Sequence, residues 1–269
     1  MSTQPFTIAP PIPPLFMPAA AIPAAATAAE RTPRLSPSQV NTLNDCAAKW
    51  WYKHALKLAD PMTLPLAIGR AVHAGIEAAL TSAADPAQVF SDTFDAEASK
   101  TLEPAHSKAK AKARAASYME IWIREAARGI GDEPDIEKEL TGTVGGIAVK
   151  AKLDILTETG RLIDIKTKYD KPRRLPAAHY LQAITYALLT NAESAQVHML
   201  CGSRSPSLQV FDVRLTPDAR RYAEAIYQSA ADQIRSGLLP PRRDSPNCSR
   251  LTCPYHLHCV RDFGGEVSL

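Results

Sequence analysis

The hydrophobic pattern of the sequence changes near residue 130, and this change limits the folds that the chain can adopt. From about residue 35 to residue 128, apolar residues recur at spacings of three and four, which indicates helices. After a break at residues 129–134, the pattern becomes one of short alternating segments bounded by turn residues, which indicates strands. We therefore predict an α/β (α+β) fold, with a sheet core that follows an N-terminal helical subdomain.

The predicted elements can be placed along the chain from caps, periodicity and turn residues. The expected helices cover residues 36–58, 66–80, a segment opened by Asp85-Pro86, 107–128, 176–191 and 217–237. The expected strands cover residues 136–143, 147–157, 161–168, 195–201 and 209–215.

The length of 269 residues suits a single core with additions. We expect one domain over residues 35–269, with a helical part (35–130), a sheet core (131–237) and a tail (238–269) that carries three cysteines. Residues 1–34 hold eight prolines and nine alanines. Proline removes backbone donors and breaks helices, so we expect a disordered tail there, outside the fold.

The sequence also limits location and partners. Residues 1–34 lack the charged start of a signal peptide and the scattered arginines of a mitochondrial presequence, and no run of 18 apolar residues occurs in the chain. We therefore expect a cytoplasmic protein without a membrane partner. The net charge of +3 permits a nucleic-acid partner but does not require one.

The segment LIDIKTK, residues 162–168, places a carboxylate and an ammonium group on one face of a predicted strand. Side chains alternate along a strand, so Asp164 and Lys166 share a face. A hairpin with the preceding strand can bring Asp154 beside Asp164. Two adjacent carboxylates repel unless a cation intervenes, and oxygen ligands suit Mg²⁺ or Mn²⁺. On these residues alone, a solvated strand face explains the pattern equally well.

Two helical patterns extend this set. Gly69, His73 and Glu77 recur every four residues and share one helical face. Gln182 and Tyr186 share a face in YLQAITY. With Glu139, Asp154 and the D-I-K strand, this order resembles the RecB-like branch of the PD-(D/E)XK nucleases over about residues 35–259.

The resemblance implies a restriction-endonuclease-like mixed sheet and a metal-dependent DNA exonuclease. Its substrate would be single-stranded DNA or duplex ends, in repair, recombination or phage DNA processing. The implied ligands of Mg²⁺ or Mn²⁺ are His73, Asp154, Asp164 and the carbonyl of Ile165. Lys166 would be the catalytic lysine, Gln182 and Tyr186 would position the lysine and the DNA strand, and Glu139 matches a common acidic position on the first strand.

The five cysteines form a second pattern. Cys248, Cys253 and Cys259 cluster near the end of the chain, whereas Cys46 and Cys201 stand alone. An odd count in a long chain does not indicate a disulfide framework, and clustered thiolates suit an iron–sulfur cluster or zinc. Zinc remains an alternative because His256 and His258, which could serve as ligands, lie in the same loop.

The cysteine pattern is similar to that of the iron–sulfur nucleases of the same branch, such as AddB-type subunits, CRISPR-associated exonucleases and the exonuclease V type. There, four thiolates hold a [4Fe–4S] cluster, which implies Cys46, Cys248, Cys253 and Cys259 as ligands here. The gap of four residues before Cys253 departs from the common gap of two. We expect such a cluster to clamp the C-terminal tail to the first helix.

Basic residues directly after the catalytic strand complete the prediction. Lys168, Lys171, Arg173 and Arg174 lie in KYDKPRR, where they are placed to hold a DNA backbone near the metal. An alternative is a non-catalytic iron–sulfur DNA-binding subunit of a recombination, helicase or CRISPR-adaptation complex. The intact set of Asp154, Asp164 and Lys166 argues against it.

Overall fold

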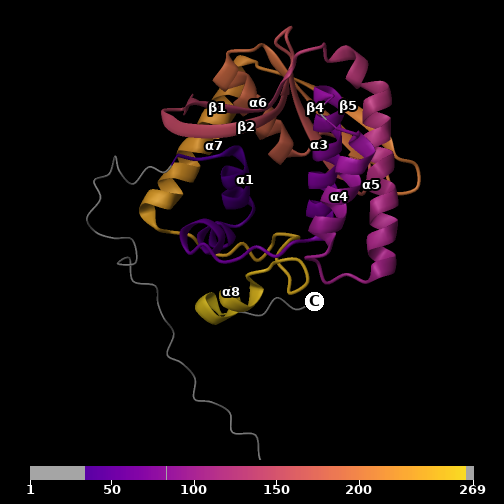
Figure 1. Cartoon of the computed structure of the whole chain (residues 1–269). Helices are drawn as coiled ribbons and strands as arrows, with labels where there is room; N and C mark the ends of the chain where they lie inside the picture. The colour runs from indigo at the N-terminus through magenta and orange to yellow at the C-terminus, as the bar shows by residue number, and fades with distance from the viewer. Residues whose placement is uncertain (1–33, 83, 265–269) are drawn as a thin grey trace, which may run out of the picture.

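The computed structural model describes residues 34–264 with the exception of residue 83 (Figure 1). Apart from Arg34, the tail predicted over residues 1–34 lies outside the described residues. No helix within the described ranges is both long enough and apolar enough to cross a membrane.

The core is a five-stranded sheet in the order β1-β2-β3-β4-β5. The strands are β1 (Asp135–Val144), β2 (Ile147–Leu156), β3 (Leu162–Lys168), β4 (Ser194–Cys201) and β5 (Ser207–Arg214). β3 and β4 run parallel, and the other neighbours run antiparallel. The parallel pair needs a crossover, which helix α6 (Ala177–Thr190) supplies. The predicted mixed sheet is confirmed.

Helices cover both faces of this sheet (Figure 1). On one face, α6, α7 (Pro217–Ser236) and α1 (Pro37–Asp45) share a hydrophobic core with the strands. On the other face, α3 (Leu64–Thr81), α4 (Pro86–Ala98) and α5 (Ala105–Glu125) form a second core with Ile155, Ile163 and Ile165. A short 3₁₀ turn, η3 (Ala127–Gly129), leads from α5 towards β1.

Helix starts follow the capping residues that the sequence indicates. The Ser36 hydroxyl accepts a hydrogen bond from the backbone N–H of Gln39. In turn, the Gln39 side-chain oxygen accepts one from the backbone N–H of Ser36. Asp85 caps α4 and Thr216 caps α7, each followed by a proline. Local signals therefore suffice at these three positions.

The single helix predicted over residues 36–58 is wrong, because the chain breaks at Cys46. Cys46 has an extended backbone (φ −162°), and it separates α1 from α2 (Ala47–Trp50) and the π-helical turn η2 (Trp51–Ala55). Contacts from the C-terminal segment explain the break. The Ala48 N–H donates to the carbonyl of Pro240 at 3.3 Å, and the Arg242 guanidinium donates to the carbonyl of Asn44 at 3.1 Å.

The C-terminal segment contains an unpredicted helix, α8 (His256–Phe263). It lies beside the segment that follows α1, as Figure 1 shows. Tyr52, Ala48, Tyr255 and Cys259 form a small buried cluster between them, and the Tyr52 hydroxyl donates to Asp262 at 2.9 Å. The two ends of the described chain are therefore packed together.

Candidate metal centre and cysteine pocket

Strands β2 and β3 bring two aspartates together. The antiparallel register sets Ile155 opposite Ile163, so Asp154 lies opposite Asp164 one step further along. There the Ile165 N–H donates to Asp154 Oδ2 at 2.6 Å. At this position the hydrogen bond to the Asp154 carboxylate replaces a backbone–backbone hydrogen bond between the strands. The closeness of Asp154 and Asp164 agrees with the predicted hairpin.

Helix α3 adds His73 to this position. His73 Nε2 donates to the carbonyl oxygen of Ile165 at 2.9 Å, and Nδ1 faces Asp154 Oδ1 at 3.6 Å. A neutral ring that donates through Nε2 keeps a lone pair on Nδ1, and metal-binding histidines commonly donate their other N–H to a carbonyl. The Ile165 carbonyl, an implied metal ligand, holds the His73 ring in this structure.

Glu137 completes the group. Ligand atoms of His73, Glu137 and Asp154 lie within 4.8 Å of one another, the one such group of three found within the described ranges. In the register of β1 and β2, Glu137 lies opposite Asp154, and its φ of +54° is unusual for a strand. It forms an ion pair with Lys152.

The resemblance in the sequence pointed to Glu139 as the acidic residue on the first strand, whereas the structure places Glu137 at the group. The Glu139 side chain is 61% exposed and pairs with Lys150 at 2.7 Å. A signal for Glu137 was present, because the turn at Gly145 and Gly146 joins β1 directly to β2. Pairing outward from such a turn sets residue 137 against Asp154.

Asp164 is fully buried next to this group. Its Oδ1 accepts from Lys166 Nζ at 2.7 Å and lies 3.3 Å from the Tyr186 hydroxyl. Its Oδ2 is buried and has no hydrogen-bond partner in the described part of the chain. A buried carboxylate oxygen without a partner is costly, so the site suits a bound cation.

Helix α6 supports Asp164 through the predicted pair. Gln182 Nε2 donates to the Tyr186 hydroxyl at 2.5 Å, and that hydroxyl lies 2.8 Å from the carbonyl of Lys152. Tyr186 is 1% exposed. The pair thus links β2 and β3 behind the carboxylates.

The pKa shifts in this cluster follow from burial and from the paired charges. Burial raises the pKa of Asp154 to about 6; the Asp164 charge adds to this rise, and His73 opposes it when its ring is protonated. Burial alone would lower the pKa of Lys166, but Asp164 and Asp154 outweigh it, so the pKa lies above its usual value. Lys166 is therefore a cationic donor beside the two carboxylates.

The predicted DNA-contacting residues lie at the end of β3, which is Lys168, and in the loop between β3 and α6. Lys168, Lys171, Arg173 and Arg174 are exposed, and within the described ranges none has a carboxylate oxygen within 4.0 Å. The neighbouring Tyr169 is 57% exposed, with the Arg114 guanidinium 4.7 Å from its ring centroid.

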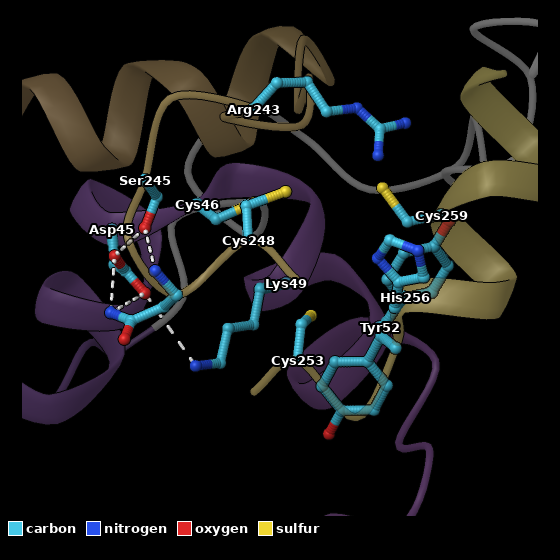
Figure 2. A pocket seen from close by; sticks show the side chains of 12 residues that line it. Asp45, Cys46, Lys49, Tyr52, Arg243, Ser245, Cys248, Cys253, His256 and Cys259 are labelled. Atoms are coloured by element: carbon cyan, nitrogen blue, oxygen red, sulfur yellow. Dashed lines mark hydrogen bonds and ion pairs between the residues drawn. The ribbon is translucent and has the colours of Figure 1, made fainter. Parts of the chain in front are cut away.

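Four of the five cysteines line one pocket between the two ends of the described chain (Figure 2). They are Cys46, Cys248, Cys253 and Cys259. Arg243 and His256 also line this pocket. Cys201 lies apart, buried on β4.

The spacing of the thiols bears on which group they can hold. Zinc–sulfur bonds of about 2.3 Å place tetrahedral thiolates roughly 3.8 Å apart. Among the residues that the structure describes, no three of these sulfurs, with or without His256, lie within 4.8 Å of one another. The thiols are thus spread more widely than a single zinc ion requires, whereas a cluster of several irons spans a wider space.

Burial also affects the acidity of these thiols. It raises the pKa of Cys253, and it raises that of Cys259 to about 11. The backbone N–H of Arg242 donates to Cys46 Sγ at 3.4 Å. A metal centre held by these thiols would have to compensate the cost of ionising them.

Solved structures support the fold. A candidate exonuclease from Eubacterium rectale superposes with a TM-score of 0.57 at 15% identity, covering 86% of this chain and 89% of that chain. A phage-related exonuclease from Haemophilus somnus gives 0.39 at 14% identity, with 77% and 95% covered. An alkaline exonuclease from Laribacter hongkongensis gives 0.35 at 14% identity, with 61% and 88% covered. The first supports the fold, and the other two are too distant to carry an argument.

Sequence comparison gives the family directly. No curated protein matches the chain. A family model, that of the PD-(D/E)XK nuclease superfamily, matches residues 34–260. This range spans the sheet, the carboxylates and the cysteine pocket. The chain belongs to the PD-(D/E)XK nuclease superfamily.

Proposed function

We propose that this protein is a deoxyribonuclease that depends on Mg²⁺ or Mn²⁺ and degrades DNA from single-stranded or duplex ends. The observation that carries this proposal is the convergence of His73, Glu137 and Asp154 beside the buried Asp164. The exonucleolytic mode rests on the resemblance to RecB-like nucleases, and a repair, recombination or phage role is the setting in which such an activity is used.

The ligands would be His73, Asp154 and Asp164, joined by Glu137. A bound divalent ion would neutralise charge on the scissile phosphate and lower the pKa of a coordinated water. The unpartnered Oδ2 of Asp164 would gain a cation, and Asp154 would be held in its charged form. The Ile165 carbonyl either joins the ligands or keeps orienting His73.

Lys166 would act as the catalytic lysine. Its ammonium group is held 2.7 Å from Asp164 Oδ1, and it carries donors that can also bind the attacking water or the phosphate. Tyr186 and Gln182 would fix the Asp164 carboxylate from behind. The exposed cations from Lys168 to Arg174 would hold the DNA backbone as it leaves the site.

The test is cleavage of end-labelled single- and double-stranded DNA with Mn²⁺, Mg²⁺ or EDTA. We expect metal-dependent degradation by the wild type and loss of at least about a hundredfold in Lys166→Ala, the cost typical of removing one transition-state donor. Lys150→Ala, an exposed lysine on β2, is the control and should match the wild type. Equal activity of Lys166→Ala would reject Lys166 as the catalytic lysine.

We further propose that Cys46, Cys248, Cys253 and Cys259 hold a [4Fe–4S] cluster. The shared pocket and the wide spacing of the thiols support this over zinc. Protein purified anaerobically should be brown and carry about four irons, the number in such a cluster. Colourless protein with stoichiometric zinc would reject it. A full cluster without cleavage under any metal would instead favour a non-catalytic DNA-binding subunit.

A further inference from the structure

Arg243 carries a buried donor that no acceptor satisfies within the described residues. Its Nη2 donates to the carbonyl of Gly264 at 2.5 Å, whereas its Nη1 is buried and has no hydrogen-bond partner there. Leaving a charged donor buried and unpaired is among the costlier polar defects in a folded protein. The fold therefore places this nitrogen where a negatively charged hydrogen-bond acceptor would satisfy it.

That site is the cysteine pocket. Figure 2 shows the Arg243 guanidinium directed towards the Cys259 thiol, at the rim of the space between the four sulfurs. The buried donor and the four sulfurs thus line the same pocket.

We propose that Arg243 is a positioning residue for the cluster, donating a charge-assisted hydrogen bond from Nη1 to one of its sulfurs. The acceptor is either a bridging sulfide or the Cys259 thiolate. This inference rests on the cluster of the proposed function. Hydrogen bonds to the sulfurs and the local net charge are the two main protein controls on the reduction potential of an iron–sulfur cluster, and Arg243 supplies both.

The two other cations near the pocket are already engaged. Lys49 lines the pocket but lies 3.8 Å from the Asp45 carboxylate, and in Figure 2 its ammonium group points away from the sulfurs. The Arg242 guanidinium binds Asp244 and the carbonyl of Asn44. Arg242 reaches the pocket only through its backbone N–H, which bonds to Cys46 Sγ.

The consequences of losing Arg243 can be measured without DNA. A positive charge stabilises the reduced cluster more than the oxidised one, so Arg243→Gln should move the midpoint potential to more negative values. Loss of a hydrogen bond to a charged acceptor should also speed iron release to a ferrous chelator by about tenfold. A role limited to docking the chain end would leave the midpoint unchanged.

The experiment compares full-length wild type, Arg243→Gln and Arg250→Gln, all purified anaerobically. Iron content is measured first, then the midpoint by mediated redox titration, and then the rate of iron release. We expect both shifts in Arg243→Gln and wild-type values in Arg250→Gln, which loses an exposed charge from the same segment. Equal values in all three iron-replete proteins would overturn the role of Arg243 and leave the cluster standing.

Two other results have a defined meaning. Wild-type protein without iron would reject the cluster, and the inference with it. Should Arg243→Gln fail to fold by circular dichroism, Arg243→Lys carries the test, because it keeps the charge but not the guanidinium geometry. Faster iron release from Arg243→Lys than from Arg250→Gln supports the inference, and equal rates overturn it.

Discussion

Glu137 reaches the candidate metal site from a backbone conformation that residues in strands rarely adopt. Its φ of +54° lies in the left-handed region, and local strain of this kind is often found where a side chain has a special task. Its ion pair with Lys152 is exposed on the lysine side, so this pair contributes little to stability. Its more important neighbours are therefore His73 and Asp154.

We predict that Glu137→Gln weakens Mn²⁺ binding by about tenfold or more, because the group loses a negative charge next to the ion. Binding is measured by calorimetry without DNA, and cleavage by the Mn²⁺ concentration that gives half-maximal rate. Glu139→Gln is the matched control, since it removes the same charge from an exposed residue of the same strand. Similar affinities in the two variants would exclude Glu137 from the site.

The three acidic strand residues of the site, Asp154, Asp164 and Glu137, illustrate how much of it can be predicted from the sequence alone. Side-chain alternation and a hairpin suffice to predict Asp154 beside Asp164, because both follow from regular strand geometry. Glu137 requires the register of β1 as well, and its backbone departs from regular strand geometry. His73 lies on a distant helix, and only the family resemblance connected it to the strands.

Among the helices, some features follow from neighbouring residues and others from contacts between distant parts of the chain. The starts of α1, α4 and α7 follow from Ser36, Asp85 and Thr216, which satisfy backbone N–H groups locally. The break at Cys46 and the helix α8 depend on contacts between segments about 200 residues apart, such as the bond from Ser245 to Asp45. No local pattern in the sequence encodes such a contact.

The loop between β3 and α6 carries a prediction of its own. Arg173 and Arg174 are exposed cations that follow β3. If each binds one phosphate of single-stranded DNA, removing both lowers the slope of log affinity against log salt by about 1.4. The measurement is fluorescence anisotropy of labelled DNA at several salt concentrations, in Ca²⁺ or EDTA to prevent cleavage.

The double variant Arg220→Gln/Arg221→Gln is the control for Arg173→Gln/Arg174→Gln. It removes two adjacent exposed arginines from α7, outside the loop. We expect its salt dependence to equal that of the wild type. A slope that falls equally in both double variants would mean that general charge, and not the loop, governs binding.

The whole molecule is closed by the contact between its two described ends. Direct contacts there include hydrogen bonds to Asp45, one of them partly buried, the bond from Tyr52 to Asp262, and a small cluster around Tyr52 and Tyr255. A cluster that joins Cys46 to Cys248 would cross-link positions about 200 residues apart, which stabilises by roughly 3–5 kcal/mol on the analogy with disulfides. The cluster would then add a large share of the free energy that keeps the C-terminal segment docked.

This reasoning predicts that Cys46→Ser loses its iron and opens the C-terminal segment. Loss of about 3 kcal/mol raises the open population more than a hundredfold, so trypsin should cleave at Arg242, Arg243 or Arg250 correspondingly faster while the sheet core stays resistant. Cys201→Ser is the control, because Cys201 lies on β4 outside the pocket and its Sγ lies 3.2 Å from Gln209 Oε1, a bond that a serine hydroxyl can replace. That variant should keep both its iron and its protection. Wild-type protection in an iron-free Cys46→Ser protein would mean that packing around Tyr52 and Tyr255, and not the cluster, holds the two segments together.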